Sequence, residues 1–180
     1  TRPDCLPDEM LAMLQRLRDE SEKDIWIELG LQSIHEATAE RIHRGYPLPV
    51  FDDAYHRLKA AGFTVIVHVI LGFPWETEDD MLATIRYLSA LEPALDGIKL
   101  QLLHVLKNTE LGRMYIAEPF RTLSLDEYCA LVVKCLRLLP PDTVIHRITG
   151  DGPKRLLLAP LWSANKKLVL NTLNRAIREA

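Results

Sequence analysis

Four short apolar runs alternate along the chain with segments in which apolar residues recur every three or four positions. The runs cover residues 24–32, 63–72, 97–105 and 142–149. Three of them are nearly continuous in Ile, Val and Leu, which is typical of strands covered on both faces. Their starts are about 34 to 45 residues apart, and each interval fits one β–α–β unit of roughly 30 residues or more. The pattern predicts an α/β fold with parallel strands.

Four amphipathic helices are predicted between and before these runs. Pro7 suits the first turn of one helix, and Gly62 is well placed to end another. Thr77 can cap a third, and Ser124 with Glu127 forms a capping box before a fourth. The residues expected to face inward are, in chain order, Met10, Leu11, Leu14, Leu17, Phe51, Ala54, Leu58, Met81, Ile85, Leu88, Tyr128, Leu131, Val132 and Cys135.

Repeated β–α units with right-handed connections form either an open doubly wound sheet or a barrel. A complete eight-stranded barrel takes about 250 residues, more than this chain has. Residues 1–4 (TRPD) resemble the end of a strand whose body precedes them. We therefore expect residues 1–180 to form a single α/β unit that is the C-terminal part of a larger domain.

Composition narrows the class of protein further. The chain has 22 Lys and Arg against 25 Asp and Glu, a formal charge of -3, which argues against a dedicated nucleic-acid binder. No apolar run approaches the roughly 18 residues that span a membrane. The three cysteines, Cys5, Cys129 and Cys135, are too few and scattered for a disulfide scaffold, so a cytoplasmic location is expected. Cys129 and Cys135 are expected to fill space in the core.

Polar residues interrupt the first apolar run. Glu28, Gly30 and Gln32 alternate with apolar residues and therefore share one face of the predicted strand. Burying a carboxylate and an amide without partners would cost several kcal/mol. These groups either hydrogen-bond to each other inside a barrel or face a polar ligand at the carboxyl end of the strand, and position alone leaves both open.

Histidines near the strands suggest a second chemistry. His68, His104 and His146 could, with Glu28, form a divalent-metal site of a barrel-type hydrolase. No closely spaced ligand pair such as HxH occurs, so no metal ligands are assigned, and His68 alone is typical of a satisfied core residue. Gly72, just after the second run, permits either a tight turn or the close approach of a flat ligand.

Basic residues gather toward the C-terminus. They are Lys154, Arg155, Lys166, Lys167, Arg175 and Arg178. Such charges usually form the solvated face of a helix, but they could also contact RNA. An RNA-binding module of a tRNA-modifying protein is therefore an alternative to an enzyme, as is a metal-dependent hydrolase using Glu28, His68 and His104.

Six strings along the whole chain resemble one known family. They are ELGLQS (28–33), RIHRGY (41–46), HVILGFPWET (68–77), LLHVLKNT (102–109), HRITGDGP (146–153) and PLWSANK (160–166). Their order and spacing resemble the radical S-adenosylmethionine (SAM) superfamily, and specifically its YhcC-type iron–sulfur oxidoreductases.

The resemblance implies a partial (β/α)6 TIM-like barrel, here its C-terminal part. In this superfamily a 4Fe–4S cluster, held by a CxxxCxxC loop, passes one electron to SAM, and a 5′-deoxyadenosyl radical then abstracts hydrogen from a substrate. An electron donor such as flavodoxin or ferredoxin is implied, and tRNA is a substrate of some relatives. No CxxxCxxC occurs in these 180 residues, so the cluster ligands lie outside this chain, which alone should be inactive.

The resemblance also implies a cofactor site. Gln32 matches an amide that contacts the ribose, and Arg44 matches a position that contacts the cofactor carboxylate, which a guanidinium can bind bidentately. His68 stands where some relatives have a ribose-binding Asp, and Leu71 and Gly72 match backbone beside the adenine. The predicted cofactor-binding residues are Glu28, Gln32, Ser33, Arg44, His68, Leu71 and Gly72.

Overall fold

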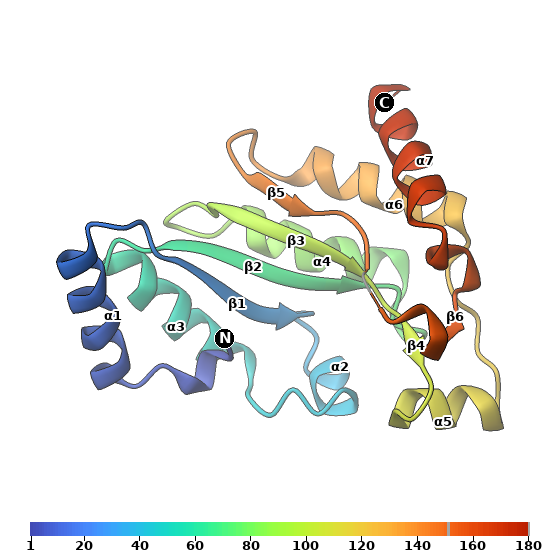
Figure 1. Ribbon diagram of the computed structural model, residues 1–180, viewed down its shortest axis with the longest axis horizontal. Coiled ribbons are helices and arrows are strands. Elements are labelled where there is room, and N and C mark those ends of the chain that lie inside the picture. The colour runs from blue at the N-terminus through green and yellow to red at the C-terminus, as the bar shows by residue number, and fades with distance from the viewer. Residues whose placement is uncertain (151, 180) are drawn as a thin grey trace.

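The computed structural model describes residues 1–150 and 152–179, so Asp151, within the HRITGDGP string, lies outside the described residues. Four parallel strands form the main sheet in the order β1–β2–β3–β5 (Figure 1). They are β1 (Trp26–Gln32), β2 (Thr64–Leu71), β3 (Gly97–Leu102) and β5 (Val144–Arg147). The predicted parallel α/β sheet, with its strands adjacent in chain order, is confirmed.

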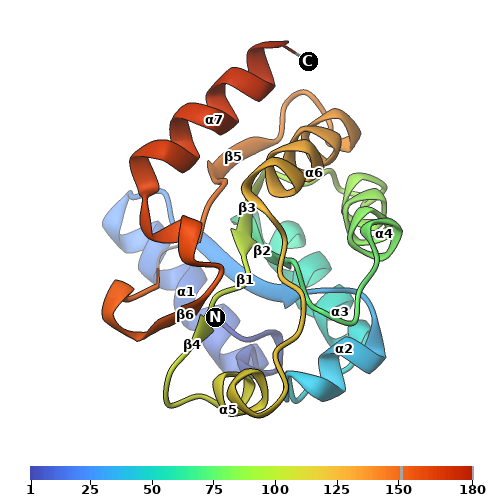
Figure 2. The same ribbon diagram turned by 90° about the vertical axis from the view of Figure 1, so that its right-hand side faces the viewer.

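Three helices cover one face of this sheet. α3 (Leu48–Ala60), α4 (Glu78–Ser89) and α6 (Leu125–Leu138) lie along it, and in the end view they form an arc outside the strands (Figures 1 and 2). The strand side chains Leu29, Val67 and Leu100 are fully buried against this layer. Successive side chains of a strand point to opposite faces of the sheet, so the other side chains point to the face that these helices leave open.

Two of the predicted helix starts have the expected caps. The Thr77 and Ser124 hydroxyls each accept a hydrogen bond from the backbone three residues later, at 3.2 Å, completing capping boxes. The helix after Pro7, α1 (Asp8–Ser21), also forms, but Met10 and Leu17 are 39% and 52% exposed. That part of the inward-facing prediction is wrong because α1 buries no residue fully and contacts the core along a narrow stripe.

The third predicted strand is shorter than its apolar run. β3 ends at Leu102, and the Leu103 N–H donates to the Leu71 carbonyl at 2.9 Å as the chain turns away. Val105–Leu106 then form β4, which pairs antiparallel with β6 (Leu157–Ala159) in a separate small sheet. The remaining helices are α2 (Glu36–Arg41), α5 (Glu110–Ala117), α7 (Lys166–Glu179) and three 3-10 segments, Pro3–Cys5, Lys154–Leu156 and Leu161–Ala164.

The main sheet is curved (Figure 2). Trp26 and His146 belong to the two edge strands, yet their rings meet edge to face with centroids 5.4 Å apart. Gly97 lies beneath them, where an added Cβ would approach the His146 ring to 2.8 Å. The face away from α3, α4 and α6 is therefore concave, as in part of a barrel.

Candidate functional site

A chain of polar side chains crosses the concave face from β1 to β3. The Glu28 carboxylate contacts the Lys99 ammonium and, at 2.9 Å, the Nε2 of His68. The Gln101 amide nitrogen lies 3.1 Å from His68 Nδ1. Because an amide nitrogen donates, Nδ1 is the acceptor and Nε2 carries the proton that bonds Glu28. Both ring nitrogens of His68 are thus engaged.

The charges of Glu28 and His68 follow from their contacts. The hydrogen bond from Lys99 holds the pKa of Glu28 below its ordinary value of 4.5, and burial lowers the pKa of His68 below 6.5. At neutral pH the carboxylate is therefore charged and the imidazole neutral. Within the described ranges no three His, Cys, Asp or Glu side chains come together, so the hydrolase alternative has no ligand set there.

The end of β1 has an unusual backbone. Gln32 has φ of 65°, in the left-handed region, next to a register shift in the pairing with β2. Its amide folds back over Gly30, where a Cβ would lie 2.7 Å from the amide nitrogen. The Tyr46 hydroxyl donates to the Gly30 carbonyl at 2.9 Å and lies 3.4 Å from Gln32 Oε1. Burial raises the pKa of Tyr46, so this donor stays protonated.

Arg44 holds the same strand end from the loop after α2. Its side chain is 1% exposed, its Nε donates to the Tyr46 carbonyl at 2.9 Å, and its Nη1 donates to the carbonyls of Leu31 (3.1 Å) and Ser33 (2.7 Å). Its Nη2 is buried and has no hydrogen-bond acceptor in the described part of the chain. Glu36 is 3.5 Å away, close enough for attraction between the charges but not for a good hydrogen bond.

Ser33 takes part in a buried network instead of facing open space. Its hydroxyl donates to Glu76 Oε1 at 2.6 Å, and Thr38 donates to the same oxygen at 2.6 Å. The Trp75 indole N–H donates to Thr38 at 2.9 Å. This network ties the end of β1 to α2 and to the loop after β2.

A cavity of about 820 Å³ opens where β1, β2 and β3 end. The residues that line it are Thr1, Arg2, Gly30, Gln32, Arg41, Ile42, His43, Arg44, Tyr46, Ile70, Phe73, Trp75, Leu103, His104, Thr109, Glu110, Leu111 and Met114. They come from the first two residues, the end of β1, the segment around the end of α2, the end of β2 with the loop after it, and the β3–α5 region. This is the position where α/β proteins bind ligands.

Two of the seven predicted site residues, Gln32 and Arg44, line this cavity. Glu28 and His68 lie in the polar chain further along the concave face. Ser33 is used by the buried network, and Leu71 is fully buried in the core. Gly72 adopts φ of 98° as the chain leaves β2, so its freedom from a side chain serves a turn.

Sequence reasoning missed the aromatic and apolar walls of the cavity. Tyr46, Phe73 and Trp75 lie within the strings RIHRGY and HVILGFPWET, but none of these three aromatic residues was assigned a role. Leu111 and Met114 come from α5, a short helix that was not predicted. An aromatic pair directly after a buried strand, as in FPW, is the signal that could have indicated a cavity wall.

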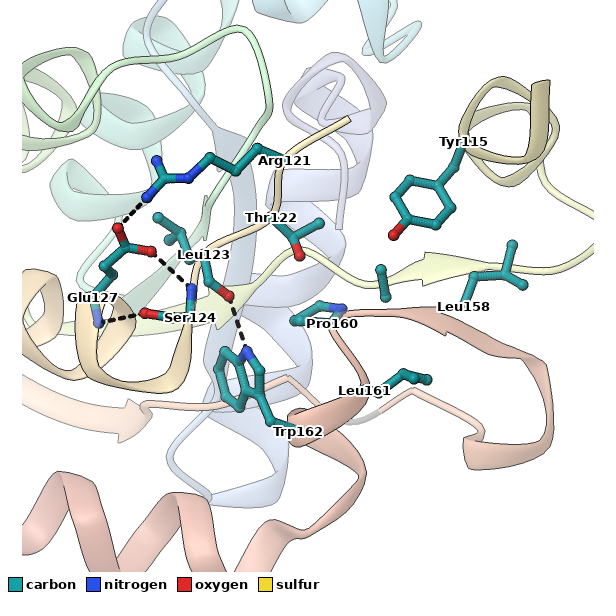
Figure 3. A pocket seen from close by; sticks show the side chains of 11 residues that line it. Tyr115, Arg121, Thr122, Leu123, Ser124, Glu127, Leu158, Pro160, Leu161 and Trp162 are labelled. Carbon is teal, nitrogen blue, oxygen red and sulfur yellow. Dashed lines mark hydrogen bonds and ion pairs between the residues drawn. The ribbon is translucent and has the colours of Figure 1, made fainter. Parts of the chain in front are cut away.

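A second hollow, of about 590 Å³, lies between the start of α6 and the segment around Pro160 (Figure 3). Several of its polar groups are already paired. The Trp162 indole donates to the Leu123 carbonyl at 2.9 Å, and Arg121 forms an ion pair with Glu127. The hollow at the ends of β1–β3 is therefore the better ligand site.

The three cysteines do not form a cluster site. Cys5 is exposed, whereas Cys129 and Cys135 are buried on α6, as expected for core residues. Burial raises the pKa of Cys135 to about 12, so its thiol stays protonated. A cubane cluster needs three or four thiolates, and no such set comes together in the described residues.

None of the described helices is both long and apolar enough to cross a membrane.

Comparison with known proteins places these features in one family. Residues 1–88 match the family model of the radical SAM superfamily, and residues 95–179 match that of the radical SAM C-terminal domain. The chain is 40% identical to YtqA of Bacillus subtilis over 177 residues, which are 98% of this chain and 54% of YtqA. It is 33% identical to YhcC of Escherichia coli, covering 99% of this chain and 57% of YhcC. It thus spans about half the length of these relatives.

The fold is similar to a solved structure. The Elp3 protein of Methanocaldococcus infernus, solved with an N-terminal deletion, superimposes with a TM-score of 0.80 at 21% sequence identity. The match covers 97% of this chain and 40% of that protein. The chain therefore shares its fold with part of that protein, and its curved parallel sheet is a partial TIM-like barrel.

Proposed function

Since this chain belongs to the radical SAM superfamily, we propose that it forms the SAM-binding and substrate-side part of an enzyme that cleaves SAM. The activity would belong to the complete protein, because the chain spans about half the length of YtqA and YhcC. With SAM and a reduced 4Fe–4S cluster bound, one electron would convert the sulfonium to methionine and a 5′-deoxyadenosyl radical that abstracts hydrogen from the substrate.

The observation that best supports this proposal is the Nη2 atom of Arg44. This atom is buried in a residue that lines the cavity, and it has no hydrogen-bond acceptor in the described part of the chain, although the Glu36 carboxylate lies 3.5 Å away. Leaving a buried N–H unsatisfied costs about 1–3 kcal/mol, and more for a charged group. A carboxylate of the cofactor would satisfy it with a charge-assisted bond while the other guanidinium nitrogens keep their backbone contacts.

The other predicted contacts are compatible with the same cavity. Gln32 presents a neutral amide, which can both donate to and accept from a pair of ribose hydroxyls. Ile70 and Phe73, which flank the Leu71–Gly72 segment, line the cavity and offer apolar surface for a purine. The contact of Leu71 and Gly72 with adenine, and that of His68 with ribose, stay predictions. The contact of Glu28, which bonds His68 further along the concave face, also stays a prediction.

The cluster does not fit the described cysteines, so we place its ligands elsewhere in the complete protein. An electron donor of the flavodoxin or ferredoxin class would supply the electron. The chain's own contribution, in this proposal, is to bind and orient SAM and to shape the space in which hydrogen abstraction occurs.

The test uses the complete protein with its cluster reconstituted without oxygen. We expect it to release 5′-deoxyadenosine from SAM, measured by chromatography, and to bind S-adenosylhomocysteine, measured by calorimetry. Gln32→Ala should weaken that binding by about 1–3 kcal/mol, because buried polar partners lose their bonds. The 180-residue chain alone should show no cleavage. Normal cleavage by a Gln32→Ala, Arg44→Ala double variant would contradict the residue assignments.

A tRNA substrate is the second proposal, and it depends on one surface. Lys167, Arg175 and Arg178 are exposed on α7, whose buried side, Val169 and Leu173, packs on the core. A basic helix face of this kind can contact phosphates. The logarithm of the binding constant of tRNA to the complete protein should then fall linearly with the logarithm of the salt concentration. Replacing the three basic residues by Gln should make the slope of that line shallower.

A further inference from the structure

Arg41 lies at the wall of the cavity without a carboxylate partner. It belongs to the last turn of α2, is exposed, and its guanidinium carbon lies 5.1 Å from the centroid of the Trp75 ring. Among the described residues it makes no ion pair. Three other basic side chains around the same cavity each face a carboxylate, in the pairs Arg2–Asp4, His43–Glu110 and Arg44–Glu36.

The ring beneath Arg41 is held in place from several sides. The Trp75 indole N–H bonds Thr38, whose hydroxyl bonds Glu76, and the ring stacks on Phe73 with centroids 5.5 Å apart and an interplanar angle of 18°. A guanidinium held over a fixed indole loses part of its rotamer freedom before any ligand arrives. The contact with the ring uses none of its N–H groups as hydrogen-bond donors to a carboxylate, so they can still form bidentate bonds.

The cavity also has an apolar lining. Ile70, Leu103 and Leu111 contribute to it. A ligand that fills the cavity therefore meets apolar surface as well as a guanidinium that no carboxylate of the described residues neutralises. This arrangement matches an amphipathic anion, with a planar or apolar body and a terminal carboxylate or phosphate.

We propose that Arg41, supported by Trp75, forms an anion subsite that binds a carboxylate or phosphate group of the molecule in this cavity. Two sources carry such a group, the amino-acid end of SAM and the substrate. We assign the group to the substrate, because the buried Nη2 of Arg44 is the proposed partner of the SAM carboxylate. The assignment to the substrate rests on the proposed function, whereas the subsite itself rests on the geometry of Arg41, Trp75 and the cavity.

The experiment measures binding to the complete protein by calorimetry. The probes are phenyl phosphate and benzoate, with uncharged benzamide as the control for the apolar body. Arg41→Gln removes the charge and keeps a good helix former in α2. Arg41→Lys keeps the charge without the planar fork. Arg113→Gln is the matched control, an exposed arginine of α5 that does not line the cavity.

We expect Arg41→Gln to weaken binding of phenyl phosphate and benzoate about tenfold, since charge-assisted bonds are the stronger class, and Arg41→Lys to weaken it less. Arg113→Gln should bind both probes like the unaltered protein, and benzamide should bind weakly to all variants. Equal affinity of the unaltered protein and Arg41→Gln for both anions would overturn the subsite, as would an equal loss in Arg113→Gln.

A second pair of ligands separates the two sources. S-adenosylhomocysteine carries the amino-acid carboxylate, and 5′-methylthioadenosine lacks it. If the subsite serves the substrate, phenyl phosphate binds equally well with S-adenosylhomocysteine present. Two results together would overturn the assignment to the substrate. S-adenosylhomocysteine would compete with phenyl phosphate, and Arg41→Gln would weaken the binding of S-adenosylhomocysteine but not that of 5′-methylthioadenosine. Binding of phenyl phosphate with no binding of either adenosine compound would instead contradict the proposed function and support the subsite.

Discussion

Replacing Arg44 by Met tests how much the end of β1 depends on one side chain. Arg44 donates three hydrogen bonds to backbone carbonyls, and its side chain is 1% exposed, so solvent does not screen them. The Leu31 carbonyl also accepts from the Ser33 N–H at 2.9 Å and would stay satisfied. The carbonyls of Ser33 and Tyr46 would lose a charged donor. Met fills the space of the aliphatic stem, so little cavity is created.

At about 1.5–2 kcal/mol for each of the two orphaned carbonyls, the variant should lose about 3–4 kcal/mol of the free energy of unfolding. Urea unfolding followed by tryptophan fluorescence measures this loss, and Arg113→Met, an exposed site, should change it by about 0.5 kcal/mol or less. A loss below about 1 kcal/mol for Arg44→Met would refute the reasoning. It would mean that relieving the burial of the charge offsets the lost hydrogen bonds.

Three further predictions concern other parts of the molecule. Lys99 lowers the pKa of Glu28, so the charged carboxylate should add to the free energy of unfolding above about pH 4.5 and lose this effect as pH falls through the lowered pKa. Urea unfolding of the unaltered protein and of Glu28→Gln across this pH range measures the difference. His68 should be neutral with its proton on Nε2 at pH 7, and nitrogen NMR showing the Nδ1–H form would contradict the bond to Glu28. Gly112→Ala should lower the thermal midpoint, although Ala normally stabilises a helix, because its Cβ would lie 2.0 Å from the Leu106 carbonyl oxygen.

The parallel sheet could be predicted because its strands are buried on both faces. Runs such as residues 63–72 are almost entirely apolar, and such runs at β–α spacing have few alternatives. The break after Leu102 could not be predicted, because residues 103–106 continue the same apolar pattern. β3 ends there because its partner β2 ends at Leu71, and the bond from the Leu103 N–H to the Leu71 carbonyl is the last between the two strands. The exposure of Met10 and Leu17 depends likewise on where α1 sits, not on its own periodicity.

The candidate site was predicted only in part. Gln32 and Arg44 were assigned from family resemblance, and both line the cavity. The contact of Arg41 with Trp75 joins residues 34 positions apart, with α3 and β2 between them, and neither residue type alone indicates a site. Polar groups on one strand face suggested a ligand at Glu28, yet the structure satisfies that carboxylate within the protein. Side-chain pairing across strands depends on register, which a single sequence leaves open.

The fold-back of the Gln32 amide over Gly30 couples these two positions in space. Any side chain at residue 30 would occupy the volume of the amide, and a replacement at residue 32 must tolerate a left-handed backbone. A Cβ at residue 30 would push the flexible amide end of Gln32 out of its place, whereas a smaller residue at position 32 leaves room for that Cβ. In a mutational scan of this segment, side chains at residue 30 should therefore be better tolerated in backgrounds that have already replaced Gln32.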